Sequence, residues 1–295
     1  MNTAPMTSQA DGPYEVHILG SKAQCAMSIW SLKTFFHNTS LVAPLVIHDD
    51  GNLDDTSIQL YRMHFPGALI LTEESVRQNA AFQRWLEPYP NLSHLRLGAD
   101  NLQSRRLLDF NFFARHPKIV VFDSDVLFLR SIDIIADFAR NDITFISADS
   151  RESYYPVFAE LPPHISKNLL RSTNASFWGT KTSTLDPKIM EDFLSTMSVQ
   201  IPNFFWTHWW LEQTILALLL SQSGSVVTLD PIKHAISHRP ITDETISHHF
   251  PGDGSRASYY RCGLRTLHSK GIFEKLGHVQ TNTSPRTRTG YNITW

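Results

Sequence analysis

Cysteine is scarce in this chain: only Cys25 and Cys262 occur among 295 residues. A scaffold held together by disulfides is therefore excluded, because such scaffolds concentrate many cysteines in a short chain. A single bridge between the two cysteines stays open, but a reducing compartment is the simpler interpretation. The cysteine content therefore predicts a cytoplasmic protein.

The chain also lacks an excess of either charge, with 26 Lys and Arg against 28 Asp and Glu and a formal net charge of −2. Nucleic-acid-binding proteins and polybasic membrane anchors carry strongly basic surfaces. No segment approaches the roughly 18 consecutive apolar residues that a membrane span requires. The polar segment 1–12 lacks the basic and apolar regions of a signal peptide. We expect neither a nucleic-acid partner nor an integral membrane segment.

Hydrophobic residues make up 42% of the chain, which indicates a globular protein with a large core. Segments with strand spacing and segments with helix spacing alternate along most of it. This alternation predicts an α/β fold with a mostly parallel, doubly wound sheet flanked by helices. The expected strands are 14–20, 41–47, one after a turn within 64–71, 119–122, 143–147, 174–180 and 226–229, and the expected helices are 26–36, 54–63, 75–86, 101–113, 132–140, 186–197 and 206–222.

No internal repeat or linker divides the chain, so we expect a single domain over 14–278. A disordered tail, 1–13, would precede it, and a tail or lid, 279–295, would follow it. Within the domain, Pro and Asn predict a loop at 89–98, and the part from 246 onward is expected to be loop-rich.

Two carboxylates interrupt the apolar stretch Ile119–Leu129, at Asp123 and Asp125. An unpaired buried charge costs several kcal/mol, so the pair is expected to hold something positive. If 119–122 is a buried strand, both side chains lie on one side at its carboxyl end, where α/β proteins bind ligands. Mg²⁺ or Mn²⁺ suits such a pair. The alternative is an exposed turn with a helix-capping Asp.

The stretch around Asp123-Ser124-Asp125 resembles the metal-binding Asp-x-Asp motif of GT-A fold glycosyltransferases. Further segments follow in the order of that family, and together they span about 14–267. The group they resemble most is the bacterial one close to the retaining, glycogenin-like members of glycosyltransferase family 8. The segments are Trp30–Lys33, His48–Gly51, Arg105–Asp109, Asn174–Phe177, Glu212-Gln213 and His249-Phe250.

The resemblance implies a GT-A type fold and a hexosyltransferase that uses a divalent metal, Mn²⁺ or Mg²⁺. Asp125 would bind the metal directly, and Asp123 would contact the donor ribose and the metal shell. His249 would be the third protein ligand, with His248 as the adjacent competitor. An imidazole beside two carboxylates favours Mn²⁺, which accepts nitrogen ligands better than Mg²⁺ does.

The resemblance also implies a nucleotide-sugar donor, most often a UDP-sugar, bound across the carboxyl ends of the first strands. His17 and Gly20 of the first strand and Ser124 of the motif are the candidate donor contacts. Arg105 and Arg106 precede the motif on a helix, where the family has a basic residue that reaches the donor. Their alternative is a solvated helix face.

The family has an Asp-Gln or similar pair beside the anomeric carbon, and Glu212 with Gln213 would take that place here. A carboxylate there orients the acceptor hydroxyl, accepts its proton or stabilises an oxocarbenium-like centre. Asn174 and Ser176 are placed to hydrogen-bond sugar hydroxyls or the acceptor. The acceptor itself, a glycan, a protein or a small metabolite, is unknown, and retention follows only from the resemblance.

Tryptophans offer two interpretations. Trp206, Trp209 and Trp210 would stack on a sugar or aglycone, or belong to the core. The ending Tyr291–Trp295 resembles the closing lid of some toxin-like glycosyltransferases, or is a frayed terminus.

Two other functions compete with glycosyl transfer. A haloacid-dehalogenase-like phosphatase also has Asp-x-Asp after an apolar strand, and Gly252–Gly254 imitates its later acidic loop. In that family, however, the motif begins the domain, and no buried strand is expected to lead into Gly252. A nucleotide-sugar-binding protein without turnover is the other alternative.

Overall fold

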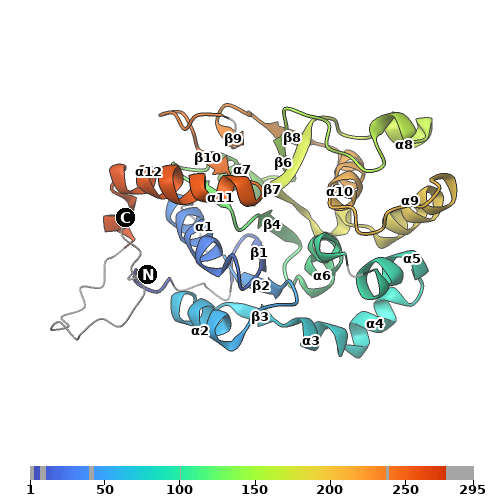
Figure 1. Ribbon diagram of the computed structural model, residues 1–295, viewed down its shortest axis with the longest axis horizontal. Coiled ribbons are helices and arrows are strands. Elements are labelled where there is room, and N and C mark those ends of the chain that lie inside the picture. Colours follow the sequence, from blue (N-terminus) through green and yellow to red (C-terminus); the bar gives the residue numbers. More distant parts are fainter. Residues whose placement is uncertain (1–2, 7–10, 40–42, 100, 237–238, 277–295) are drawn as a thin grey trace.

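The central element of the computed structural model is a seven-stranded sheet, within the described residues 3–6, 11–39, 43–99, 101–236 and 239–276 (Figure 1). Its strand order is β3-β2-β1-β4-β7-β6-β8. Neighbouring strands are parallel except where β7 pairs with β4 and β6. The prediction of a mostly parallel α/β sheet is confirmed. The strands are β1 Glu15–Gly20, β2 Leu45–Asp49, β3 Leu69–Leu71, β4 Lys118–Phe122, β6 Thr144–Ala148, β7 Thr173–Lys181 and β8 Val226–Leu229.

Helices cover both faces of this sheet, and each face has its own hydrophobic core. Along β4, Ile119 and Val121 point into one core while Val120 and Phe122 point into the other, as the two-residue repeat of a strand requires. The first core lies under α4 Ala80–Leu86, α5 Pro90–Ser93, α6 Arg105–Phe113, α9 Pro187–Gln200 and α10 Leu211–Ser221, and the second under α1 Cys25–Asn38, α2 Asp55–His64 and α7 Asp133–Arg140.

A second, three-stranded sheet follows the carboxyl end of β4. The chain leaves β4, turns through Asp123–Asp125 and starts β5 Val126–Phe128. β5 pairs antiparallel with β10 Ser247–His249, and β10 pairs parallel with β9 His234–Ile236. The sequence predicts none of these three short strands. Through its pairing with β5, β10 brings residues from far along the chain beside the Asp123–Asp125 turn.

Three local predictions are wrong, each for a reason in the side chains. The helix expected over 75–86 is two helices, α3 Glu73–Arg77 and α4, because the Asn79 side chain accepts hydrogen bonds from Ala81 N and Phe82 N and starts α4 anew. The loop expected over 89–98 is α5 followed by a π-helical turn at His94–Gly98, because Leu92 of α5 and Leu95 of the turn are buried in the core. The helix expected from 206 begins only at Leu211, because the His208 side chain accepts a hydrogen bond from Trp210 N and 206–210 is held in turns.

The loop-rich part expected from 246 onward is also wrong over most of 253–275. Four helical segments follow one another there: α11 Asp253–Ser258, a π-helical turn at Tyr259–Gly263, α12 Leu264–Ser269 and α13 Ile272–Lys275. Tyr259, Leu264 and Leu267 bury their side chains against Met27 and Trp30 of α1. The Tyr259 hydroxyl also donates to Met27 O at 3.0 Å. The apolar residues of this segment therefore pack against α1 and make it helical, not a loop.

Parts of the N-terminal segment are packed against the domain. Within 1–13, for which a disordered tail is expected, Thr3 is buried. Lys33 donates to Ala4 O, and Met6 N donates to His64 O at 2.8 Å. The expected tail or lid, 279–295, with Trp295, lies outside the described residues.

Two further expectations concern cysteine and the membrane. Both cysteines are free, with Cys25 buried and Cys262 exposed, so they form no bridge with each other. Among the described residues, no helix has the length and apolar content needed to cross a membrane. The remaining short helical segments are α8 Pro163–Ser166 and 3₁₀ turns at Leu102–Ser104, Phe158–Glu160 and Thr182–Thr184.

Candidate functional site

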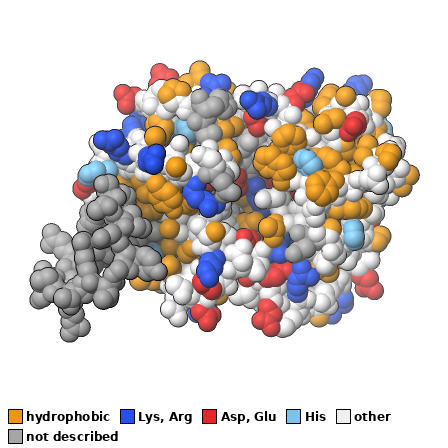
Figure 2. Space-filling model, in the orientation of Figure 1, with side chains coloured by type: hydrophobic (Ala, Val, Ile, Leu, Met, Phe, Trp, Pro, Cys, Tyr) orange, Lys and Arg blue, Asp and Glu red, His pale blue; other side chains and the backbone are white. Residues whose placement is uncertain are grey.

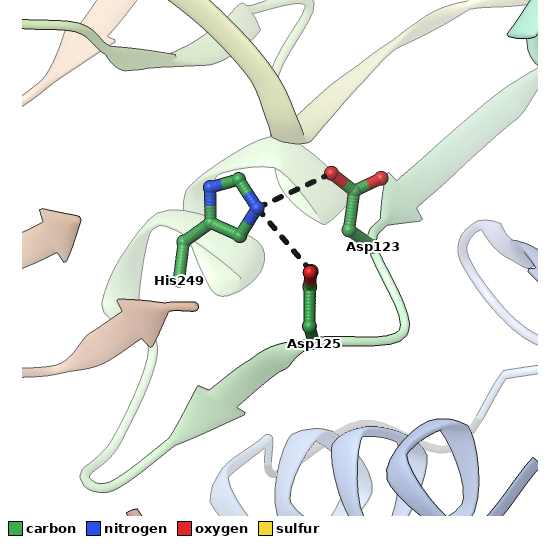
Figure 3. A group of neighbouring side chains, drawn as sticks. All are labelled: Asp123, Asp125 and His249. Atoms are coloured by element: carbon green, nitrogen blue, oxygen red, sulfur yellow. Dashed lines mark ion pairs between the residues drawn. The ribbon is translucent and has the colours of Figure 1, made fainter. Parts of the chain in front are cut away.

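Asp123, Asp125 and His249 converge at the carboxyl end of β4 (Figure 3). His249 Nε2 lies 3.2 Å from Asp125 Oδ1 and 3.6 Å from Asp123 Oδ2. The structure therefore places His249 beside both carboxylates. One ligand atom from each residue lies within 4.8 Å of the other two. Two oxygens and one imidazole nitrogen at such spacing suit a divalent cation with water or substrate in its remaining positions.

Backbone hydrogen bonds hold this turn in place. Asp123 N donates to Ser176 O of β7 at 2.9 Å, and Val126 N donates back to Asp123 O at 3.2 Å. Phe250 N donates to Asp125 O at 3.0 Å, which ties the turn to the end of β10. The backbone of the turn is thus fixed by two elements that are distant in sequence.

The electrostatics of the three residues favour a bound cation. Burial raises the pKa of Asp123, and the nearby Asp125 carboxylate adds to this effect against Arg106. Burial acts to lower the pKa of His249, but the two carboxylates outweigh it and raise that pKa. Asp125 Oδ1 is buried, and it lies at the ion-pair distance of 3.2 Å from His249 Nε2. The carboxylate oxygens and His249 Nε2 face one another across the cluster, so this arrangement fits a cation held by Asp125, Asp123 and His249.

His248 points away from this cluster. Its Nε2 lies 3.1 Å from Arg239 O, and its ring contacts Phe250 at 4.3 Å between centroids. Successive side chains of a strand alternate between faces, so only one of the two histidines of β10 can face the carboxylates. That histidine is His249.

Arg106 lies beside the cluster from α6. Its Nη1 is 3.0 Å from Asp123 Oδ1 and 3.7 Å from Glu212 Oε1, and its Nη2 donates to Ala175 O. Burial opposes the charge of Arg106, but Asp123 and Glu212 outweigh it and raise its pKa. The residue therefore places a fixed positive charge between the turn and α10.

Arg105 points elsewhere on the same sheet edge. Its Nη1 donates to Asp49 O at 2.8 Å and lies 3.3 Å from Glu73 Oε2. Its guanidinium also fills the space beside Gly51, whose φ of +101° favours glycine. Arg105 and Arg106 are 2% and 5% exposed, so the solvated helix face is excluded for both.

Glu212 is buried at the start of α10 next to Arg106. Burial raises its pKa to about 7, because the effect of burial exceeds that of the Arg106 charge, and Asp123 adds to it. Its Oε1 makes no hydrogen bond within the described residues. The structure thus brings Glu212 to the site with a carboxyl group that titrates near neutral pH.

Three predicted site residues lie where α10 packs against β7: Gln213 of α10 and Asn174 and Ser176 of β7. Gln213 accepts from Ala175 N at 3.1 Å and donates to Ser153 O at 2.7 Å, so its amide fixes two chain segments. Asn174 accepts from Ser176 N at 2.9 Å and donates to Asp149 Oδ2 at 3.0 Å. Asp149 directly follows β6 and is absent from the predicted set, although its place at a strand end is a signal for it.

Ser124, Gly20 and His17 have different surroundings. The Ser124 hydroxyl donates to Gln24 Oε1, a residue outside the predicted set. Gly20 ends β1, and a side chain there would meet the Tyr61 hydroxyl at 3.0 Å. His17 is fully buried in β1, with Nδ1 2.9 Å from His48 Nε2 and Nε2 3.2 Å from Glu15 Oε2. The structure therefore does not bring His17 to the cluster.

Comparison with known proteins gives similarity in structure alone. No family model matches the chain, and no curated protein matches it in sequence. The fold is similar to apo mouse xyloside xylosyltransferase 1, with 11% identity, a TM-score of 0.51 and coverage of 84% of this chain and 98% of that one. It is also similar to galactosyltransferase LgtC in complex with donor and acceptor sugar analogs, with 13% identity, a TM-score of 0.50 and coverage of 92% and 97%. With helices on both faces of its mixed, mostly parallel sheet, the chain has the GT-A fold of these glycosyltransferases.

Proposed function

We propose that this protein is a metal-dependent glycosyltransferase that moves a sugar from a nucleotide-diphosphate donor to an acceptor hydroxyl. The observation that carries the proposal is the Asp123–Asp125–His249 cluster at the carboxyl end of β4 in a GT-A fold. In finer terms, we propose a UDP-sugar donor, retention of anomeric configuration and a place near the glycogenin-like group of family 8. The free cysteines support a reducing compartment such as the cytoplasm.

Mn²⁺ or Mg²⁺ would be held by Asp123, Asp125 and His249, and the imidazole nitrogen favours Mn²⁺. When bound, the cation supplies positive charge that stabilises the diphosphate leaving group. Arg106 adds a second, permanent positive charge at 3.0 Å from Asp123, already ordered before the donor binds. Ser124 and Gly20 lie at the strand ends that the donor would cross.

Glu212 is the candidate acid or base of the site. Its pKa of about 7 lets it hold or release a proton near neutral pH, which suits a group that orients the acceptor hydroxyl or accepts its proton. Gln213 and Asn174 are positioning residues, because their amides already bind Ala175 N, Ser153 O and Ser176 N. Ser176, next to them on β7, would hydrogen-bond a hydroxyl of the sugar or the acceptor.

One feature favours the phosphatase alternative, and three count against it. A short buried strand, β10, does lead toward Gly252, contrary to the expectation from sequence. However, β10 belongs to the small sheet, and Asp123 is paired with Arg106 rather than free as a nucleophile. The chain also has a GT-A fold, in which the Asp-x-Asp turn follows several strands and helices. A binding protein without turnover needs the same cluster, so only an assay separates it from the enzyme.

The decisive assay incubates the protein with a panel of nucleotide sugars and Mn²⁺ and measures donor hydrolysis and transfer. We expect hydrolysis of at least one UDP-sugar, removed by EDTA and restored by Mn²⁺. Asp125→Asn should lower the rate by at least about 100-fold, since it removes preorganised charge stabilisation. Asp192→Asn, at an exposed ion pair, is the matched control and should change nothing.

Two results would contradict the proposal. Hydrolysis of p-nitrophenyl phosphate that depends on Asp123, without donor hydrolysis, would favour the phosphatase. Binding of UDP with Mn²⁺ but no hydrolysis or transfer with any donor would favour a binding protein.

A further inference from the structure

Aromatic side chains gather on the segment just before α10 and on the facing segment 153–157. Lys, Arg, Asp and Glu are absent from 193–211. Phe205 is 56% exposed and Trp209 is 65% exposed, although such large apolar groups are usually covered. Figure 2 shows hydrophobic side chains gathered over the region where β7, α8 and α10 lie in Figure 1. We call this set the aromatic wall: Tyr155, Phe205, His208, Trp209 and Trp210.

The rings of the wall support one another. Tyr155 and His208 stack at 4.2 Å between centroids with an interplanar angle of 7°. Phe205 N donates to the Tyr155 hydroxyl, and Trp210 N donates to His208 Nδ1 at 3.1 Å. Trp209 contacts Trp210 at 5.3 Å between centroids. These contacts hold the backbone at Phe205 and Trp210 and the rings of Tyr155 and His208, which lowers the entropic cost of binding.

Hydrogen bonds join the wall to the candidate catalytic residues. Tyr155 N donates to Thr214 Oγ1 of α10 at 2.8 Å, and Gln213 Nε2 donates to Ser153 O at 2.7 Å. Trp209 lies three residues before Glu212 in the chain. The wall therefore continues the proposed site on its α10 side.

The exposed rings of the wall differ from the neighbouring aromatics that pack into the core, and Tyr155 connects the two because it packs against that core and against Phe204. Phe204 is 8% exposed and belongs to the core under α10, and Trp206 packs against the same core with its carbonyl bound by Asn101 Nδ2. Trp209 and Phe205 take no part in that core. Adjacent exposed aromatic groups mark a binding surface more often than isolated ones do.

The chemistry of the wall favours a carbohydrate as its occupant. A pyranose ring has an apolar face of C–H groups and a rim of hydroxyls, and aromatic rings with polar edges complement both. A lipid surface would call for basic residues beside the aromatics, and 193–211 contains none.

We propose that the aromatic wall is the acceptor subsite, where a pyranose ring of a glycan lies against Trp209 and Phe205 with a hydroxyl directed toward Glu212. This inference rests on the proposed function and deepens it, because it reduces the acceptor from a glycan, a protein or a small metabolite to a glycan.

The test measures sugar binding directly and then transfer. Saturation-transfer NMR and tryptophan fluorescence titrate maltose, lactose and xylobiose against the full chain, without donor. For the sugars that bind, Trp209→Ala should weaken binding about tenfold or more, and Trp209→Phe should restore most of it. Val199→Ala, at an aliphatic side chain 85% exposed on α9, is the matched control and should bind as the unchanged protein does. In transfer assays, Trp209→Ala should raise the acceptor KM by the same factor and change kcat less.

Each other outcome overturns the inference or separates it from the proposed function. Sugar binding that is unchanged in Trp209→Ala, or absent from the starting protein, overturns it. Binding to phosphatidylcholine vesicles instead of sugars identifies the wall as a lipid-binding surface. If sugars bind through Trp209 but no donor is ever turned over, the proposed function fails while the sugar site stands. If donors are turned over and acceptors are used without Trp209, only the inference fails.

Discussion

Two buried charge clusters lie along the same edge of the central sheet, and they differ in how completely they are paired. Glu73 follows β3 and Asp123 follows β4, and the strands from β3 to β4 are parallel, so both residues lie at carboxyl ends. In the first cluster, the Arg96 network, the Arg96 guanidinium donates to both oxygens of Asp109 at 2.7 and 2.8 Å and to both oxygens of Glu73 at 3.0 and 2.7 Å.

The second cluster, the Asp123 site, is incomplete by the same measure. Among the described residues, Asp125 Oδ1 has an ion pair with His249 Nε2 at 3.2 Å, and Glu212 Oε1 has a longer contact with Arg106 Nη1 at 3.7 Å but no hydrogen bond. In the Arg96 network, by contrast, all four contacts of the guanidinium with Asp109 and Glu73 are hydrogen bonds of 3.0 Å or shorter. A saturated cluster stabilises the fold, and an incomplete one keeps coordination capacity for a ligand. We therefore propose that similar residue types at one sheet edge have different roles here, and that the pairing of individual atoms distinguishes them.

The largest expected effect comes from breaking the saturated cluster. Arg96→Met leaves the Asp109 carboxylate buried without its partner, so the free energy of unfolding should fall by about 3–5 kcal/mol. Urea unfolding at neutral pH measures the change. Arg77→Met is the control, because Arg77 also pairs with Glu73 but its side chain is 38% exposed, and it should cost about 1 kcal/mol or less. A fall of less than about 1 kcal/mol in the free energy of unfolding of Arg96→Met would contradict a stabilising role for the network.

Removing a charge from the Asp123 site should instead raise the free energy of unfolding. Because the pKa of Glu212 rises from 4.5 to about 7 on folding, its carboxyl group is favoured in the protonated form, and this stability is lost as pH rises through 7. In metal-free buffer at pH 8, Glu212→Gln should therefore raise the free energy of unfolding by up to about 3 kcal/mol.

Below pH 4 the gain from Glu212→Gln should vanish, because the carboxyl group is then protonated in both states. Denaturant titrations at pH 4 and pH 8 measure this difference. Glu160→Gln, at an exposed residue, should stay within about 0.5 kcal/mol at both pH values. An equal loss of stability in Glu212→Gln at both values would place Glu212 with the saturated type of cluster.

Metal binding offers a third contrast between the clusters. Mn²⁺ at about 100 times its dissociation constant should stabilise the protein by about 2.7 kcal/mol, as expected for a ligand that binds only the native state. Thermal unfolding with and without Mn²⁺ measures this gain. Asp123→Asn and Asp125→Asn should each remove the gain, whereas Arg96→Met should keep it on a lower baseline. If Arg96→Met also lost it, the two clusters would be coupled rather than separate.

Features of the fold and the site that depend on short-range sequence patterns could be predicted from the sequence. The buried run 119–122 and the two-residue spacing of Asp123 and Asp125 indicate a strand end with paired carboxylates. The three-residue strands β5 and β10 are too short for such a pattern, so their pairing was visible only in the structure. The roles of Arg105 and Arg106 depend on the rotation of α6, which places one guanidinium at Asp49 and the other at Asp123.

The helices after 253 show the same limit. Glycine, proline and polar residues around 251–255 suggest loops, but Tyr259, Leu264 and Leu267 find their packing partners on α1, more than 200 residues earlier in the chain. Gln24 is missed because a single polar residue in a loop carries no pattern. Asp149 has the weak signal of its place at a strand end, and its contact with Asn174 identifies it, as the contact with Ser124 identifies Gln24.

The choice between His248 and His249 is the smallest difference to test and the one that the sequence left open. Adjacent residues of β10 face opposite ways, with His249 Nε2 at 3.2 Å from Asp125 and His248 Nε2 at Arg239 O. His249→Ala should weaken Mn²⁺ binding by about 10- to 100-fold, measured by calorimetry, because the cluster then keeps two carboxylates. His248→Ala, a matched change one residue away, should leave Mn²⁺ affinity within about threefold and lower stability instead, since a buried side chain is lost. The reverse result would require the strand to slip by one residue, and such a slip would turn every side chain of β10 to the other face.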